Sequence, residues 1–240
     1  MTGAPALVPS DASGLANADV WVVVPAFNEA SVVGRTVRDL RTAFPRVIVV
    51  DDGSADGTGR VAQAAGAVVV RHPINLGQGA ALQTGVECAL VRGARLVATF
   101  DADGQHHVAD LQCMVDIVRT RPVDVALGSR FLGRAENMPP GRRLALRAAV
   151  VLTWLTTGVK LTDAHNGLRV FTAQTARRLN LVQDQMAHAS EVVATIGRLG
   201  LRWTEVPVTI SYTPYSLDKG QRLSNSVRII ADLIGGWFLR

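Results

Sequence analysis

Five short runs of apolar, largely β-branched residues occur in the first half of the chain. They are Val20–Val24, Val47–Val50, Ala67–Val70, Leu96–Phe100 and Val123–Leu127. Short apolar runs without strict polar alternation are typical of strands buried on both faces, as in a parallel sheet. Helix-length stretches separate the runs, over 29–44, 56–65, 77–92 and 108–120. Strands and helices therefore alternate, and the sequence predicts an α/β fold with a Rossmann-like, mostly parallel sheet flanked by helices.

The pattern changes after Gly128. We expect helices over 142–159 and 187–199 and a strand over 201–210. Residues 224–239 predict an amphipathic C-terminal helix, because apolar side chains recur there at helical spacing. They are Val227, Ile230, Leu233, Ile234 and Trp237. Such a helix can lie on a membrane surface, or it can pack on its own core or on a sister subunit of a homo-oligomer.

The chain divides into three parts on this reading. Residues 1–19 are small and polar, so we expect a flexible lead and not a signal peptide. Residues 20–211 form one folded domain, and residues 212–240 form a basic loop and the amphipathic helix. Because no stretch of roughly 18 apolar residues occurs, we expect no membrane-spanning helix.

The composition limits the partners. The 240 residues carry 25 Lys and Arg against 20 Asp and Glu, and this net charge of +5 suits phosphate-bearing partners such as a nucleotide or an anionic membrane surface. Aromatic residues make up only 5% and do not interleave with basic stretches, so we expect no nucleic acid partner. Cys88 and Cys113 are far apart in the sequence, which predicts reduced thiols and a cytoplasmic location.

Carboxylates follow three of the predicted strands. The first run leads into "PAFNEA", the second into "DDGSADGT" and the fourth into "DADGQH". Ligands of an open parallel sheet bind beyond the carboxyl ends of the strands, so these acids should face one crevice. A single acid in such a place is commonly a helix N-cap, and we expect Asp56 to be one. Three acidic strand ends together favour a ligand site.

An acidic crevice needs a cation before it can bind a phosphate. Mg²⁺ and Mn²⁺ take hard oxygen ligands and bridge carboxylates to a diphosphate. We expect Asp101 and Asp103 to hold this metal or its bound water, with the amide oxygen of Gln105 as a further ligand. A zinc site at His106 and His107 would need a second His or Cys pair, and the chain has none at metal spacing.

A glycine-rich segment, "NLGQGAALQTG", covers residues 75–85. Its backbone N–H groups could bind a phosphate at a helix start, or its glycines could serve close packing of a helix on the sheet. It lacks the Walker pattern, so an ATPase is not expected.

These motifs together resemble the family 2 glycosyltransferases of the GT-A fold. "VVVPAFNEA", "VVDDGSADGT", "NLGQGAALQTG", "DADGQH" and "GSR" occur in the order of that family. The acid motif is most similar to the dolichol-phosphate mannose synthase-like branch. The resemblance covers 20–211, with a nucleotide-binding half over 20–128 and an acceptor half over 129–211.

The resemblance implies roles for individual residues. The nucleotide would contact Pro25, Phe27, Glu29, Asp52, Asp101, Ala102, Lys219 and Arg222. The metal and diphosphate would be held by Asp101, Asp103 and Gln105. Arg130 would reach a phosphate, while Asp163, Gly167 and Arg169 of "TDAHNGLRVF" would lie near the acceptor. Lys219 and Arg222 belong to a basic loop whose sequence departs from the branch, so which of them contacts the diphosphate stays open.

The resemblance implies an inverting, metal-dependent transfer of a sugar from a UDP- or GDP-sugar to a polyprenyl phosphate. An ionised phosphate needs cationic positioning, whereas a sugar hydroxyl needs a general base. The second half of the chain offers many arginines and one obvious acid in a predicted acceptor helix, Glu191, which favours the phosphate. The alternatives are a hydroxyl acceptor with Glu191 as base, a nucleotidyltransferase, and a non-catalytic membrane-surface module. We expect a peripheral protein at the inner face of the cell membrane, attached directly or through a small membrane protein.

Overall fold

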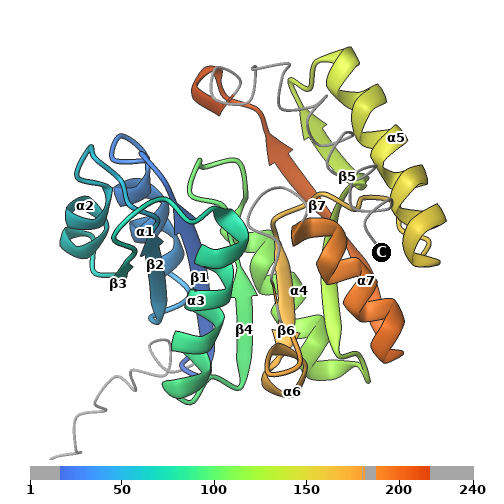
Figure 1. Ribbon diagram of the computed structural model, residues 1–240, viewed down its shortest axis with the longest axis horizontal. Helices are drawn as coiled ribbons and strands as arrows, with labels where there is room; N and C mark the ends of the chain where they lie inside the picture. Colours follow the sequence, from blue (N-terminus) through green and yellow to red (C-terminus); the bar gives the residue numbers. More distant parts are fainter. Residues whose placement is uncertain (1–16, 180, 182–187, 217–240) are drawn as a thin grey trace, which may run out of the picture.

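The structure is a computed structural model that describes residues 17–179, 181 and 188–216 (Figure 1). Its strands are β1 (Val20–Ala26), β2 (Val47–Asp51), β3 (Val68–Arg71), β4 (Leu96–Thr99), β5 (Val125–Glu136), β6 (Arg169–Thr172) and β7 (Trp203–Ser211). Its helices are α1 (Val33–Arg41), α2 (Thr58–Ala64), α3 (Gln78–Val91), α4 (Val108–Thr120), α5 (Pro140–Thr157), α6 (Ala173–Ala176) and α7 (His188–Leu199). The predicted basic loop beyond Ser216, with Lys219 and Arg222, and the predicted helix over 224–239 lie outside the described residues.

All seven strands form one sheet in the order β3-β2-β1-β4-β6-β5-β7. The pairs β1–β2, β1–β4, β2–β3 and β5–β7 are parallel. β6 is antiparallel to both of its neighbours, β4 and β5. The predicted mostly parallel sheet is therefore confirmed, with one reversed strand in its middle.

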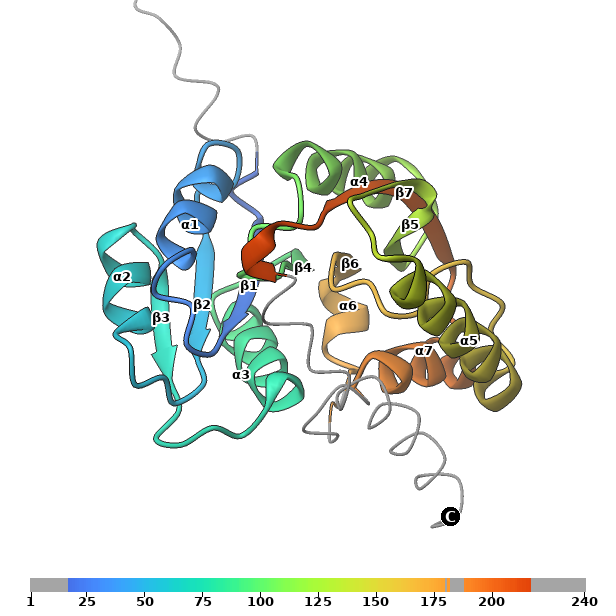
Figure 2. The same cartoon turned by 90° about the horizontal axis from the view of Figure 1, so that it is seen from above.

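Helices cover both faces of the sheet (Figure 2). One face packs against α1, α2 and α4, and the other against α3, α6 and α7. Along β1, Val22 and Val24 enter the first core while Trp21 and Val23 enter the second. A strand that buries both of its faces has no room for polar alternation, which explains the continuous apolar runs.

Several predicted boundaries need correction. The strand expected to end at Leu127 continues to Glu136, with an irregularity between Ser129 and Arg134. β6 was not predicted, because its sequence, Arg169–Thr172, begins and ends with a polar residue and so forms no apolar run. The helix expected from Glu29 begins at Val33, since the chain first turns through the crevice.

The N-cap of α2 is also corrected. Gly57, with φ +86°, holds that position, and Asp56 precedes it. The Asp56 carboxylate still accepts hydrogen bonds from the N–H groups of Thr58 and Ala30, so it ties the helix start to the loop after β1.

Two further findings concern the described part of the chain. Cys88 and Cys113 are both free thiols. No helix among residues 17–179, 181 and 188–216 is long and apolar enough to cross a bilayer.

Candidate active site

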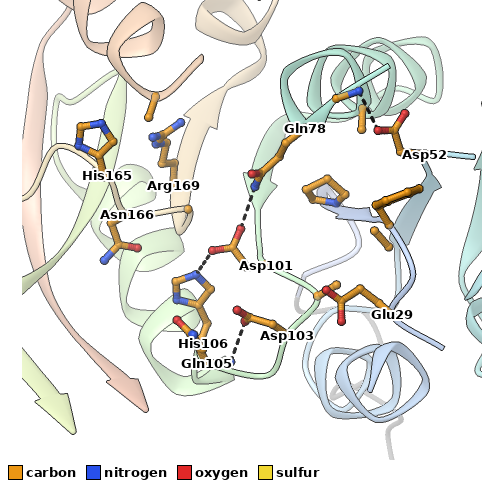
Figure 3. A pocket seen from close by; sticks show the side chains of 18 of the residues that line it. Glu29, Asp52, Gln78, Asp101, Asp103, Gln105, His106, His165, Asn166 and Arg169 are labelled. Carbon is orange, nitrogen blue, oxygen red and sulfur yellow. Dashed lines mark hydrogen bonds and ion pairs between the residues drawn. The ribbon is translucent and has the colours of Figure 1, made fainter. Parts of the chain in front are cut away.

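A cavity of about 680 Å³ opens at the carboxyl ends of β1 and β4 (Figure 3). In the sheet, β2 lies on one side of β1 and β4 lies on the other side. This is the point where the strand order reverses, and open α/β sheets bind ligands there. The acidic strand ends predicted to meet in one crevice do so.

The loop after β1 forms one wall. Pro25, Phe27 and Glu29, which were predicted to contact the nucleotide, all line the cavity. The Glu29 carboxylate is buried and accepts a hydrogen bond from the Tyr215 hydroxyl at 2.7 Å. Tyr215 follows β7, so the far end of the described chain contacts the loop after β1.

Asp52 also lines the cavity, but its oxygens already bind protein groups. They accept the N–H groups of Leu76 and Gly77 at 2.9 and 2.8 Å, and His72 Nδ1 lies 2.7 Å away. The two backbone amides of the glycine-rich segment thus point at Asp52. In the same segment a Cβ at Gly85 would overlap Val23, so this glycine serves close helix packing.

Asp101 and Asp103 follow β4 on a loop that turns at Gly104, where φ is +74°. Both carboxylates line the cavity, as do Ala102 and Gln105. Asp101 lies 2.9 Å from His106 Nε2, and the Gln105 N–H donates to Asp103 at 3.1 Å. These contacts hold the acid loop in shape.

The two carboxylates disfavour each other's charge. Burial and the neighbouring Asp101 carboxylate together raise the pKa of Asp103 to about 6, against the opposing effect of His106. In the described ranges no three His, Cys, Asp or Glu side chains converge as a metal cage. Two carboxylates and an amide oxygen nevertheless fit Mg²⁺ or Mn²⁺, which keep several positions for water and substrate phosphates.

The opposite side of the cavity is basic. Arg130 is buried and lines it, and its guanidinium donates to Asp163 at 2.6 Å and to the Tyr212 hydroxyl at 2.8 Å. Burial alone would lower the pKa of Arg130, but Asp163 and Tyr212 raise it above its ordinary value. Asp163 itself does not line the cavity. It is therefore a positioning residue for Arg130.

Arg169, the first residue of β6, points into the same space (Figure 3). It is only 4% exposed, and its guanidinium makes no hydrogen bond or ion pair with another residue of the described ranges. Burial lowers the pKa of Arg169 to about 10, against the pull of Asp101 and Asp163. The group stays cationic at neutral pH, and because it lines the cavity it can bind an anionic ligand there.

The two walls meet at Gly167. Its carbonyl accepts a hydrogen bond from the Thr99 hydroxyl at 2.6 Å, and a Cβ at this position would overlap the Asp101 carboxylate. Glycine is therefore required for the acceptor half to approach the acid loop.

Glu191 is a second predicted catalytic residue that does not line the cavity. It is in the first turn of α7, whereas Ala189 of the same helix does line the cavity. Helical geometry turns residues two apart to different faces, which is why the predicted helix did not reveal this.

The sequence interpretation missed five polar residues of the cavity: Asn75, Gln78, His106, His165 and Asn166. His106 was considered as a zinc ligand, and the structure shows that it binds Asp101. His165 and Asn166 sit between the predicted Asp163 and Gly167, so their place in the motif was the only available signal. Arg142, predicted among the acceptor-half cations, lines the cavity and stacks over the Tyr212 ring at 4.9 Å.

Known proteins share sequence with this chain over most of its length. The chain is 38% identical over 221 residues to the uncharacterized protein MJ1222 of Methanocaldococcus jannaschii, covering 90% of this chain and 91% of that protein. It is 33% identical to an undecaprenyl-phosphate mannosyltransferase of Micrococcus luteus, over 79% of this chain and 82% of the relative.

A solved structure shares the fold. It is glucosyl-3-phosphoglycerate synthase from Mycobacterium tuberculosis in complex with Mn²⁺, UDP and glucosyl-3-phosphoglycerate. The TM-score is 0.70 at 21% identity, over 98% of this chain and 86% of that chain. The family model for glycosyl transferase family 2 matches residues 21–179, which include the acid loop and most of the basic wall. The chain therefore belongs to glycosyl transferase family 2 and is a glycosyltransferase of the GT-A fold.

Proposed function

We propose that this glycosyltransferase moves a sugar from a nucleoside diphosphate sugar to a polyprenyl phosphate. The observation that carries the proposal is the buried Arg169 guanidinium, which lines one cavity with two carboxylates and has no hydrogen-bond or ion-pair partner among the described residues. An acidic wall suits a metal-bound diphosphate, and a separate buried cation suits a second phosphate group. The Micrococcus luteus relative is an undecaprenyl-phosphate mannosyltransferase, which supports the same class of acceptor.

The donor would bind between the loop after β1 and the acid loop. Pro25, Phe27 and Glu29 would contact the nucleoside. Asp101, Asp103 and Gln105 would hold Mg²⁺ or Mn²⁺, which supplies positive charge to the leaving diphosphate. The fold neighbour was solved with Mn²⁺ and UDP, but for this chain the argument rests on its own carboxylates.

The acceptor would bind on the basic wall. A phosphate monoester is ionised near neutral pH, so it can attack without a general base. Arg130 and Arg169 would orient it, and Asp163 would keep Arg130 in place. One phosphate oxygen then bonds to the anomeric carbon as the bond to the diphosphate breaks, which inverts the anomeric centre. The position of Glu191 off the cavity disfavours a hydroxyl acceptor activated by that residue.

The lipid acceptor places the protein at a membrane, and α5 offers a suitable face. Leu144, Val151 and Leu155 lie on one stripe of this helix and are 73%, 53% and 70% exposed. Arg143 and Arg147 follow one border of the stripe by helical spacing and are exposed. Apolar residues bordered by arginines suit an anionic membrane surface. Since Arg142 of the same helix lines the cavity, we propose peripheral binding at the inner membrane face through α5.

A transfer assay tests the activity. The full chain is incubated with labelled UDP-glucose, UDP-N-acetylglucosamine or GDP-mannose, Mn²⁺ and undecaprenyl phosphate, and the organic phase is counted. We expect lipid-linked label from one donor, lost without Mn²⁺. Arg169→Gln should reduce the rate by at least about 100-fold, as loss of a charge-stabilising group does.

Glu191→Gln tests the alternative, in which Glu191 is the base that activates a hydroxyl acceptor. It should keep most of the activity toward the lipid phosphate. Transfer to a saccharide but never to the lipid, abolished by Glu191→Gln, would overturn the proposed acceptor.

A further inference from the structure

His165 lines the cavity with a polar side chain whose role the residues described so far do not explain. Both ring nitrogens are buried, and neither has a hydrogen-bond partner in the part of the chain that is described. The residue lines the cavity beside Arg169 (Figure 3). Buried polar atoms in folded proteins are nearly always paired, so two unpaired nitrogens on one ring indicate a missing partner.

The backbone around this ring is held in place. The His165 carbonyl accepts a hydrogen bond from Arg130 Nη2 at 2.7 Å, and its N–H group lies 3.4 Å from an Asp163 oxygen. The ion pair that positions Arg130 therefore also positions His165. A side chain on a fixed backbone can discriminate between ligands that differ by a single group.

The charge state of the His165 ring limits which chemical groups can form hydrogen bonds with it. Burial lowers the pKa of His165 to about 4, and Arg169 and Arg130 contribute while Asp163 opposes them. The imidazole is therefore neutral at pH 7, with one nitrogen that donates and one that accepts. A phosphate oxygen can only accept a hydrogen bond. A hydroxyl both donates and accepts, so it can satisfy either nitrogen.

The His165 ring lies away from the wall proposed to bind the nucleoside, so we look for its partner in another part of the substrate. Figure 3 shows His165 next to Arg169 and Asn166, on the side of Asp101 away from Asp52 and Glu29. The hydroxyl-bearing group expected in this part of the cavity is the transferred sugar, which joins the diphosphate to the acceptor. A polyprenyl phosphate carries no hydroxyl. This reasoning rests on the proposed function for the presence of a sugar donor.

We propose that His165 binds a hydroxyl group of the transferred sugar and thereby selects which sugar the enzyme accepts. The residue is a specificity-determining residue, separate from the carboxylates that face the diphosphate and from the arginine that faces the acceptor phosphate.

Binding measurements without acceptor test this directly. For wild type and His165→Phe, calorimetry with Mn²⁺ compares UDP or GDP with the matching sugar nucleotide, chosen from the three donors above. We expect His165→Phe to weaken binding of the preferred sugar nucleotide by about 5- to 30-fold, the range for one lost hydrogen bond to a buried group. Affinity for the free nucleoside diphosphate should not change.

Two controls separate recognition from structure. His165→Gln keeps a donor and an acceptor, so it should restore part of the sugar affinity. His107→Phe alters an exposed histidine that bonds to Ser211 and should alter neither affinity. In steady-state assays, His165→Phe should also reduce the preference for the natural donor over its monodeoxy analogue at one ring position.

The outcomes are distinct. Equal loss of affinity for nucleoside diphosphate and sugar nucleotide, or an unchanged preference for every monodeoxy analogue, would overturn the role of His165. Sugar-dependent affinity that needs His165 but no transfer to undecaprenyl phosphate would instead overturn the proposed acceptor and leave the sugar contact standing.

Discussion

Gly167 is the residue on which the two halves of the cavity depend. Its backbone contacts the Asp101 carboxylate with no space for a side chain, and its carbonyl is bonded to Thr99. Asp101 in turn contacts His106 and Gln78. Because residue 167 has no Cβ, the Asp101 carboxylate can occupy its place between the two walls of the cavity.

We expect Gly167→Ala to displace Asp101 and to lower kcat by at least about 100-fold, in the range seen when a charge-stabilising group is lost. The fold should persist, because the sheet residues next to position 167 keep their pairings. Gly141→Ala is the matched control. Gly141 lies in α5, and a Cβ at this position would have no other atom within 4 Å. This variant should keep full activity and gain stability slightly. A fully active Gly167→Ala enzyme would contradict the role of this contact.

His165 also makes stability depend on pH. Its folded pKa of about 4 lies below its ordinary 6.5, so the unfolded chain takes up the proton first as pH falls. The free energy of unfolding should therefore decrease from about pH 6.5 to about pH 4, by at most about 3 kcal/mol from this residue. His165→Gln should show a shallower decrease in urea titrations across that window. Parallel pH profiles for wild type and variant would contradict the neutral imidazole.

At the scale of elements, β6 and α5 add basic residues to a cavity whose acidic residues come from the first half of the chain. β6 reverses direction between β4 and β5, which brings Arg169 to the carboxyl end of β4. α5 begins at the cavity with Arg142 and packs on α7. One element supplies the buried cation, and the other connects the cavity to an exposed apolar face.

We expect the double variant Leu144→Ser, Leu155→Ser to reduce binding to anionic phospholipid vesicles by about tenfold or more, since each leucine contributes over 1 kcal/mol when buried in lipid. Val91→Ser is the control, because Val91 is also an exposed apolar residue, at 87%, but belongs to α3 and not to α5. Vesicle flotation measures both. Unchanged flotation of the double variant would show that α5 is not the membrane-binding face, and would favour the predicted helix over 224–239 instead.

At the scale of the whole molecule, the cavity is formed by both halves, so a ligand bound there should stabilise the entire domain. UDP or GDP at about 100 times its Kd adds about 2.7 kcal/mol, which raises Tm by about 5–10 °C for a domain of this size. We expect this shift only when Mn²⁺ is present, and we expect Asp103→Asn to lose it. An equal shift in excess EDTA would contradict metal-dependent donor binding.

The sequence predicted the first half of this molecule well, and the reason is physical. β1, β2 and β4 are buried on both faces and the edge strand β3 is partly buried, so apolar runs mark all four, and parallel strands bring their terminal acids together without further information. The basic wall is different. His165, Asn166 and Arg142 line one cavity only because β6 is antiparallel and α5 starts nearby, and neither arrangement has a local sequence signal. Lys219 and Arg222 stay predictions.

The place of β6 in the sheet also has a consequence for how the chain folds during synthesis. β4 lies next to β6, which the ribosome makes about 70 residues later, and β5 pairs only with β6 and β7. A growing chain that has emerged only as far as β5 therefore exposes an unpaired edge of β4, and β5 has no strand beside it. Unpaired strand edges invite pairing between chains. Fragments that stop before Arg169 should aggregate, and the interval before β6 emerges is when this enzyme most needs a chaperone.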